Sequence, residues 1–210
     1  MSNYQLFHND LPTKILRSFK GDISIDTETL GLNIKRDRLC LVQLRNESNK
    51  KIYLIKFDKT LSPKNSKNLK ILMENKSLTK IFHYARFDLG VLKENLNINV
   101  KNFFCTKVAS KLLRTYSSKH GLKDLVKEIL DIELDKNEQT SDWSKKVLTK
   151  KQIQYAINDI LYLSKIKIYF ENKLEEAGRI KTFNSIMKFM MTRVELDLMG
   201  WENTDIFAHR

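Results

Sequence analysis

The amino-acid sequence predicts a single layered α/β domain, in which a mixed five-stranded sheet is flanked by helices and followed by a helical C-terminal extension. Strand patterns dominate the first half of the chain, helical patterns fill the second half, and 210 residues with 41% hydrophobic content can bury one sizeable core. The chain has two prolines and six glycines, and no Pro-rich or Ser/Gly-rich stretch marks a linker. We therefore expect residues 1–178 to form the main domain. Residues 179–210 should add a C-terminal helix and tail to the same globular unit.

Five segments have the features of β-strands. Residues 22–26 and 50–57 alternate apolar and polar side chains, and residues 39–44 form an apolar run between them. We interpret these three segments as an antiparallel meander. Two more apolar segments, residues 80–83 and 100–105, complete the expected sheet.

The other patterned segments are expected to be helical. Residues 121–130 are clearly amphipathic. Thr149 is a good N-cap for a long helix that runs toward Glu176 and is broken by Gly178. The remaining expected helices cover residues 66–74, 87–95, 106–113 and 182–198.

The charge balance favours a polyanionic partner. Lys and Arg total 38 against 25 Asp and Glu, which gives a formal net charge of +13. Nucleic acid is the usual partner of such an excess. The excess is a weak indication by itself, because lysine is abundant throughout the chain and no dense basic block occurs.

The sequence indicates neither a membrane protein nor a disulfide-stabilised one. No apolar run approaches the roughly 18–20 residues needed to cross a bilayer, and the N-terminus lacks the pattern of a signal peptide. Cys40 and Cys105 lie in apolar strand-like segments, where we expect small, buried free thiols. The expected location is the reducing cytoplasm.

Asp26 and Glu28 end the first strand pattern. Two acids separated by one residue point to the same side of an extended chain, so both carboxylates can reach one cation. Charges that follow an apolar strand are unfavourable unless a positive group compensates them. Mg²⁺ and Mn²⁺ would do so, because these cations prefer carboxylate oxygens. For this pair alone, the alternative is a polar strand end in a turn.

Two further acids lie on predicted helices. Asp88 follows a buried strand at a helix start, where an acid also compensates the helix dipole. Tyr155 and Asp159 are spaced i, i+4, so the phenol and the carboxylate share one helical face. The apolar neighbours of Asp159 place its carboxylate partly inside the protein, where it needs a partner. An ordinary hydrogen bond or ion pair is the alternative for this element.

Taken together, the four carboxylates of Asp26, Glu28, Asp88 and Asp159 indicate a metal-dependent reaction. They can hold two divalent ions about 3.5–4 Å apart, an arrangement that serves in-line attack on a phosphodiester. Tyr155 would orient the attacking water and help to take its proton. The sequence has no P-loop, zinc-ligand spacing or Gly-x-Ser-x-Gly elbow that would indicate another chemistry.

These segments, in this order, resemble the motifs of DEDD-type 3′-5′ exonucleases. Asp26-Thr27-Glu28 is similar to the first motif, Asp88 to the second, and Tyr155-x-x-x-Asp159 to the third motif in its tyrosine variant. Residues 141–163 also resemble the ribonuclease D signature, with Ser-Asp-Trp, Leu-Thr, Gln and Tyr-Ala-x-x-Asp in the same order. The resemblance implies a ribonuclease H-like fold and an exonuclease that releases nucleoside 5′-monophosphates.

Within the ribonuclease D group, the chain resembles the short nanoRNase C branch. Ribonuclease D carries additional C-terminal helical domains, and we expect none in this chain because of its length. The resemblance to nanoRNase C implies hydrolysis of RNA dinucleotides and a closed homo-oligomeric ring, an octamer. Tyr84 departs from the pattern of many relatives, which have Asn after the histidine of the second motif. The segments that carry this resemblance are residues 26–32, 36–40, 104–107, 114–116, 120–123 and 200–209.

Several other residues are candidates for substrate contact. The resemblance implies that Leu30 wedges against the terminal bases, and ordinary turn packing is the alternative. His83 and Arg86 can contact the substrate phosphate or pair with a nearby acid. A polar loop can meet the 5′ end of the substrate or simply be solvated. The remaining candidates are Thr27 of the first motif and the loop residues Arg114, Ser118 and His120.

Three functions agree with these residues. The first is a dinucleotide-preferring 3′-5′ exoribonuclease. The second is ribonuclease D-like trimming of longer RNA 3′ ends, such as tRNA precursors, or a 3′-5′ exonuclease acting on DNA ends. The third is a non-catalytic nucleic-acid-binding protein. The absence of a concentrated basic tract favours short substrates, and the presence of all four acids and Tyr155 favours an enzyme.

The C-terminal segment predicts a further contact. Residues 182–198 carry more apolar side chains than one helical face needs, and Trp201, Ile206 and Phe207 follow in a tail. Leaving such a side chain in water costs about 1.5–3 kcal/mol. The tail should therefore fold back onto the domain or bury against another subunit of a symmetric oligomer.

Overall fold

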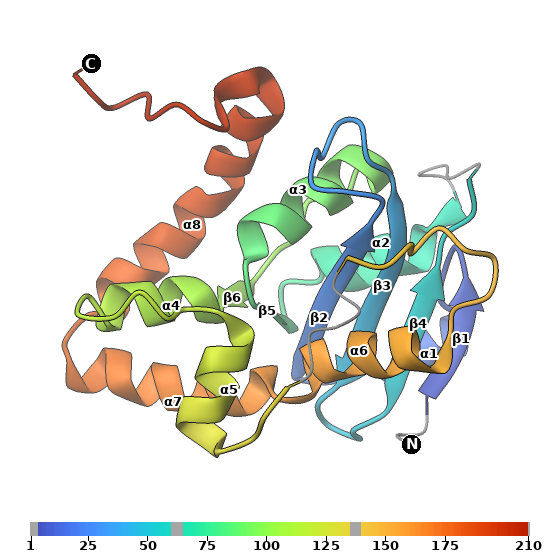
Figure 1. The fold of residues 1–210 in the computed structure, drawn as a ribbon, viewed down its shortest axis with the longest axis horizontal. Helices are drawn as coiled ribbons and strands as arrows, with labels where there is room; N and C mark the ends of the chain where they lie inside the picture. The colour runs from blue at the N-terminus through green and yellow to red at the C-terminus, as the bar shows by residue number, and fades with distance from the viewer. Residues whose placement is uncertain (1–3, 60–64, 135–139, 210) are drawn as a thin grey trace.

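Six strands form one mixed sheet in a computed structural model that describes residues 4–59, 65–134 and 140–209 (Figure 1). Strands β2, β3 and β4 form the predicted antiparallel meander, while β1 is parallel to β4, and β5 and β6 extend the sheet in parallel from β2. The spatial order is β1-β4-β3-β2-β5-β6. The prediction of a mixed sheet flanked by helices is therefore confirmed. The strands are β1 (Tyr4–His8), β2 (Asp22–Thr29), β3 (Leu39–Asn46), β4 (Ile52–Lys56), β5 (Thr79–Phe82) and β6 (Phe103–Cys105).

The prediction of five strands was wrong by one. The additional strand, β1, has five residues and pairs with β4 at the edge of the sheet. Its side chains are half-buried or exposed, so this segment lacks the apolar alternation that identifies the other strands. At the opposite edge, only Phe103–Cys105 of the predicted 100–105 strand pairs with β5.

Helices cover both faces of the sheet. Figure 1 shows α6 lying across β2 and β3. The side chains of β2 alternate between the two faces, so Thr27 points away from α6 and contacts α3. The helices are α1 (Thr13–Leu16), α2 (Lys67–Glu74), α3 (Ala85–Leu96), α4 (Thr106–Leu113), α5 (Leu122–Leu130), α6 (Lys150–Leu161), α7 (Leu163–Glu176) and α8 (Ile180–Leu196).

The long helix predicted from Thr149 is in fact two helices. Its N-terminus is as expected: the Thr149 hydroxyl accepts a hydrogen bond from the Gln152 amide at 3.1 Å, and the Gln152 side chain accepts one from the Thr149 amide at 3.0 Å. The chain then bends at Tyr162, which separates α6 from α7. At this bend the carbonyl oxygen of Leu161 accepts a hydrogen bond from Arg45 of β3. This contact with the sheet is invisible in the local helical pattern.

The C-terminal helix packs against the domain. α8 contacts α3, α4 and α7 and buries Phe183, Met187, Met190 and Val194. A π-type turn, Asp197–Trp201, follows. α8 is therefore packed on three helices that precede it in the chain. Among the described residues, we find no helix with the length and apolar character needed to span a membrane.

Candidate active site

The first motif lies at the C-terminal end of β2. Asp26 and Glu28 point to the face that α6 covers, and Asp26 pairs in register with Gln43 of β3. The Gln43 side chain donates to Glu28 Oε1 at 3.4 Å. Thr27 points to the opposite face, where its buried hydroxyl donates to Asp88 Oδ1 of α3 at 2.7 Å. The end of β2 therefore carries Asp26 and Glu28 on one face and contacts Asp88 of the second motif from the opposite face.

The third motif lies on α6 and is held by packing and hydrogen bonds. Tyr155 and Asp159 occupy one face of this helix, and both are half-buried. The side-chain amide of Gln152 donates to the Ser141 hydroxyl and to the Asp142 carbonyl, each at 3.0 Å. These bonds hold the loop before α6, and from this loop the Trp143 ring packs against the Tyr155 ring with centroids 6.0 Å apart. The Ser-Asp-Trp segment thus packs against Tyr155 of the third motif.

Three of the four predicted acids form one group. Carboxylate oxygens of Asp26, Glu28 and Asp159 all lie within 4.8 Å of one another. Burial and the charges of Asp88, Asp159 and Glu28 raise the pKa of Asp26 well above its usual range. Glu28 has a raised pKa mainly because of burial and the Asp159 charge. Asp88 lies outside this three-carboxylate group, and burial raises the pKa of its carboxyl to about 7 despite the hydrogen bond from Thr27.

This group fits a divalent cation. Besides burial, the charges that raise the pKa of Asp26 are those of three other carboxylates. The site therefore concentrates negative charge where little water is available to solvate it. Oxygen ligands of this kind suit Mg²⁺ or Mn²⁺. Asp26, Glu28 and Asp159 are the residues that would hold an ion together, and Asp88 is the fourth predicted ligand.

Tyr155 is a neutral phenol in this arrangement. Burial, the charge of Asp159 and the phenol's hydrogen bond to that carboxylate all raise the pKa of Tyr155. A neutral hydroxyl can donate one hydrogen bond and accept others. A hydroxyl on this helix face, hydrogen-bonded to Asp159, is placed to contact a water bound beside the carboxylates.

The residues around the second motif are paired within the protein. His83 Nδ1 lies 2.9 Å from the Thr106 hydroxyl. Arg86 Nε and Nη2 donate to the two carboxylate oxygens of Asp197 at 2.5 and 2.7 Å. For Arg86, this contact matches the alternative of pairing with a nearby acid. Tyr84 has φ 133°, a strained conformation for a residue with a side chain, and such strain often occurs at functional sites.

The other candidates for substrate contact occupy different positions. Leu30 follows the first motif and is 50% exposed, so its side chain is available to a ligand. Arg114 and His120 both contact the Ser110 hydroxyl, at 3.2 and 2.9 Å, and Ser118 is exposed in the same loop. This loop begins at the C-terminal end of α4, while the N-terminal residue of that helix, Thr106, contacts His83 of the second motif.

A cavity of 470 Å³ adjoins the second motif. It is bordered by the loop that follows Leu30, by the start of α3 and by the turn after α8. A space of this size can accommodate a small organic ligand. Its lining includes Leu32, Asn33, Lys35, Tyr84, Arg86 and Asn203.

The sequence analysis did not single out two residues of this region. Gln43 is an amide within the apolar run of β3, and an isolated buried polar group in such a run is a signal for a specific partner. Asp197 contacts Arg86 across 111 positions of the chain. No local pattern predicts a contact over that separation.

Comparison with known proteins identifies the family. The chain matches the 3′-5′ exonuclease family over residues 6–175 and belongs to it. Ribonuclease D from Desulfotalea psychrophila is 31% identical over 166 residues, which cover 79% of this chain and 43% of that protein. The chain thus spans less than half the length of this relative.

Solved structures of NrnC from Brucella melitensis are similar over nearly the whole chain. One is 44% identical with a TM-score of 0.92 and covers 99% of both chains. NrnC bound to pGG and NrnC with bound Mg²⁺ are each 43% identical with TM-scores of 0.91 and full coverage of both chains. Ribonuclease D of Escherichia coli shares the fold, with 24% identity and a TM-score of 0.76 over 91% of this chain and 50% of that one. The expected family, fold and nanoRNase C resemblance are confirmed.

Proposed function

We propose that this protein is a metal-dependent 3′-5′ exoribonuclease that hydrolyses RNA dinucleotides to nucleoside 5′-monophosphates. The observation that carries the proposal is the convergence of Asp26 and Glu28 of β2 with Asp159 of α6, whose carboxylate oxygens lie within 4.8 Å of one another. Tyr155 lies on the same face of α6 as Asp159. When bound, divalent ions would activate a water for attack on the phosphodiester and stabilise the charge that develops on the leaving 3′-oxygen.

Each side chain of the site would have a separate role in the reaction. Asp26, Glu28, Asp88 and Asp159 supply the negative charge that holds the cations. The hydroxyl of Tyr155 would orient the attacking water by hydrogen bonding and help to take its proton. Leu30, half exposed beside the first motif, would pack against the terminal base. Thr27 would act on the substrate only indirectly, through its hydrogen bond to Asp88.

The preference for dinucleotides rests on the similarity to NrnC, which has been solved bound to pGG. The cavity beside the second motif has room for part of a nucleotide, and Arg86 is one of its lining residues. His83 precedes Tyr84, another lining residue, and is the other candidate for contact with the substrate phosphate. The alternatives are trimming of longer RNA ends, as in ribonuclease D, hydrolysis of DNA 3′ ends and a non-catalytic binding role. The 5′ end of the substrate would approach the loop of Arg114, Ser118 and His120.

The test is a turnover comparison on 5′-labelled RNAs of two, three, five and twenty nucleotides, with Mg²⁺ and with Mn²⁺. Turnover should be fastest on the dinucleotide, and EDTA should abolish it reversibly. Asp26→Ala and Asp159→Ala, purified in parallel to expose contaminating nucleases, should lose at least about a hundredfold in kcat while remaining folded. Full activity in either variant or in EDTA excludes the metal mechanism. Equal turnover on all lengths excludes the dinucleotide preference.

The protein should also assemble as a closed homo-oligomeric ring, an octamer. Trp201, Ile206 and Phe207 are 43%, 43% and 77% exposed in the single chain, and Phe189 of α8 is 42% exposed. The tail does contact its own chain, since the Phe207 ring lies 6.3 Å from that of Phe189, but the remaining exposed apolar surface is what supports burial against another subunit. Light scattering on the intact protein and on a truncation after Gly200 tests the assembly. A monomeric intact protein rejects the ring, and a truncated protein that still assembles fully excludes the tail as the contact.

Both cysteines, Cys40 and Cys105, are buried free thiols. Their state agrees with action in the reducing cytoplasm, where RNA fragments arise. Fractionation of cells followed by immunoblotting tests this location.

A further inference from the structure

The C-terminal end of α6 is held by a charged cluster on the sheet. Arg45 of β3 donates through Nη1 to the carbonyl oxygen of Leu161 at 3.1 Å. Leu161 is the last residue of α6, and the carbonyls of a last helical turn have no partner within their own helix. The positive guanidinium also lies at the negative end of the helix dipole. Arg45 therefore satisfies both a hydrogen-bond acceptor and a partial charge at this end.

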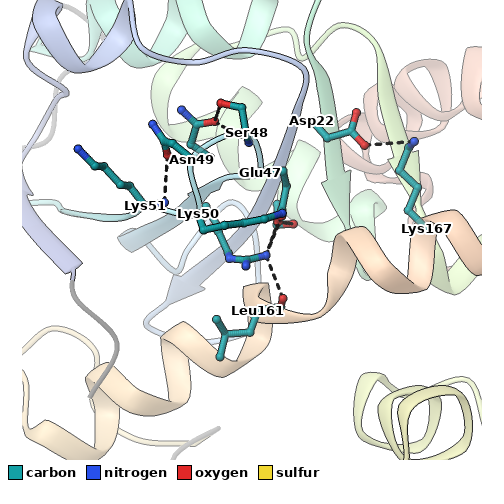
Figure 2. Close-up of polar contacts among 11 residues, drawn as sticks. Asp22, Glu47, Ser48, Asn49, Lys50, Lys51, Leu161 and Lys167 are labelled. Carbon is teal, nitrogen blue, oxygen red and sulfur yellow. Dashed lines mark hydrogen bonds and ion pairs between the residues drawn. The ribbon is translucent and has the colours of Figure 1, made fainter.

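Arg45 is itself held in place. The same nitrogen lies 2.8 and 2.7 Å from the two carboxylate oxygens of Glu47, whose side chain is 6% exposed. Glu47 also accepts hydrogen bonds from the Ser24 hydroxyl at 2.6 Å and from Lys50 at 2.9 Å. Figure 2 shows the dashed contact to the carbonyl oxygen of Leu161, at the end of the helix, with Glu47 on the sheet side of it. A buried ion pair with additional hydrogen bonds is a rigid support.

The cluster and the catalytic carboxylates lie on the same face of the same strands. Ser24 pairs in register with Arg45, and Asp26 pairs with Gln43, so two successive cross-strand pairs face α6. Asp159 precedes Leu161 by two residues, a rise of about 3 Å along the helix. A displacement of the helix end would therefore move the Asp159 carboxylate by a similar distance.

We propose that Arg45 is a positioning residue, which fixes α6 against the sheet and thereby places Asp159 and Tyr155 beside Asp26. The inference rests on the proposed function, because it concerns the same carboxylate site. Misplacement of a reacting group by about 1 Å can lower a rate about a hundredfold. Loss of the Arg45 contact should thus reduce cation affinity and kcat more than it reduces substrate binding.

Lys167 supplies a matched control. It pairs with Asp22 of β2 at 3.2 Å and with Glu171 at 2.7 Å, and its side chain is 12% exposed against 16% for Arg45. Figure 2 shows this pair beyond the bend, with Lys167 on α7 and Asp22 on the neighbouring strand β2. Lys167→Met removes a similarly buried cation that connects a helix to β2. Because Lys167 is on α7, this change removes no contact of α6.

The experiment compares Arg45→Met, Glu47→Gln and Lys167→Met with the unaltered protein. The readouts are Mn²⁺ affinity by calorimetry, kcat and KM on a dinucleotide, and thermal unfolding. Arg45→Met should weaken Mn²⁺ binding about fivefold and lower kcat about tenfold, with KM changed less than about twofold. Glu47→Gln, which keeps the shape but loosens the hold on Arg45, should change both values in the same direction. Lys167→Met should lower the unfolding temperature alone.

Each result has one meaning. A folded Arg45→Met protein with unchanged Mn²⁺ affinity and kcat overturns the inference. If Arg45→Met does not fold, Glu47→Gln decides, and it overturns the inference if it behaves like Lys167→Met. An unaltered protein that binds Mn²⁺ but hydrolyses no RNA contradicts the proposed function, while the Mn²⁺ affinities still test the positioning by Arg45.

Discussion

Replacing Asp26 with Asn should stabilise the metal-free protein and remove its response to divalent cations. Asp26 lies among Glu28, Asp88 and Asp159, and burial together with these charges raises the pKa of its carboxyl. Asn has nearly the same shape but carries no charge. Folding of the variant would bring three carboxylates together instead of four, so the repulsion between carboxylates in the folded state should fall.

The expected size of this effect follows from the geometry. Two unit charges 4.8 Å apart repel by about 3–4 kcal/mol at an effective dielectric constant of about 20. Proton uptake sets an upper limit, because keeping a carboxyl with a usual pKa of 3.8 protonated at pH 7 costs about 4 kcal/mol. Since neighbouring carboxyls share this relief, we expect Asp26→Asn to add about 2 kcal/mol to the free energy of unfolding. For a chain of this size, that corresponds to a rise in Tm of about 4–8 °C.

Thermal unfolding in EDTA and in Mg²⁺ measures both parts of the prediction. In EDTA the Asp26→Asn protein should melt above the unaltered protein, whereas Mg²⁺ should raise the Tm of the unaltered protein more. Asp58→Asn, at an acid whose side chain is 55% exposed after β4, is the matched charge control and should change neither value appreciably. An Asp26→Asn protein that melts below the unaltered protein in EDTA would refute the repulsion argument. A full Mg²⁺ response in that variant would remove Asp26 from the cation site.

Three further predictions concern single side chains. Tyr155→Phe should lower kcat strongly with little change in KM, because the lost hydroxyl acts mainly in the transition state; steady-state kinetics showing a raised KM and unchanged kcat would make Tyr155 a binding residue. Burial lowers the pKa of Lys80 from 10.5 to about 8. Between about pH 8 and pH 10.5, Lys80 therefore carries its proton more often in the unfolded chain than in the folded protein. Stability should therefore rise with pH, by up to about 2 kcal/mol from about pH 7.5 to 9.5, and urea unfolding of Lys80→Met should lack this rise. Asp197→Asn should destabilise the protein by about 2 kcal/mol in urea unfolding, because it leaves Arg86 without its bidentate partner; the same change at exposed Asp205 should have little effect.

Local patterns explain how much of the fold the sequence could predict. The meander, the Thr149 cap and the helix Thr106–Leu113 depend on neighbours in the chain, and all three were predicted correctly. The strand Tyr4–His8 was missed because its pairing with β4 involves residues about 50 positions away. The bend at Tyr162 was missed for a related reason, since the Arg45 contact joins residues 116 positions apart.

The site shows the same division between local and long-range information. The acids were recognisable because carboxylates at an apolar strand end and on an apolar helix face require a partner. The pairing of Arg86 with Asp197 could not be predicted, because it joins α3 to the turn after α8. The roles of Leu30 and of the loop at Arg114 remain predictions, because they depend on a bound substrate.

The face of the sheet beneath α6 shows why stability and catalysis oppose each other here. β2 presents Ile23 and Ile25 to the side that packs against α3, but it presents Ser24, Asp26 and Glu28 to α6. A protein selected only for stability would place apolar side chains on both faces of such a central strand. The Ser24 end of this polar strip is satisfied within the protein by Glu47 and the cluster around it, whereas the Asp26 end contains mutually repelling carboxylates. The satisfied end can therefore hold the helix rigidly, while the repelling end gains its compensating charge only from a cation.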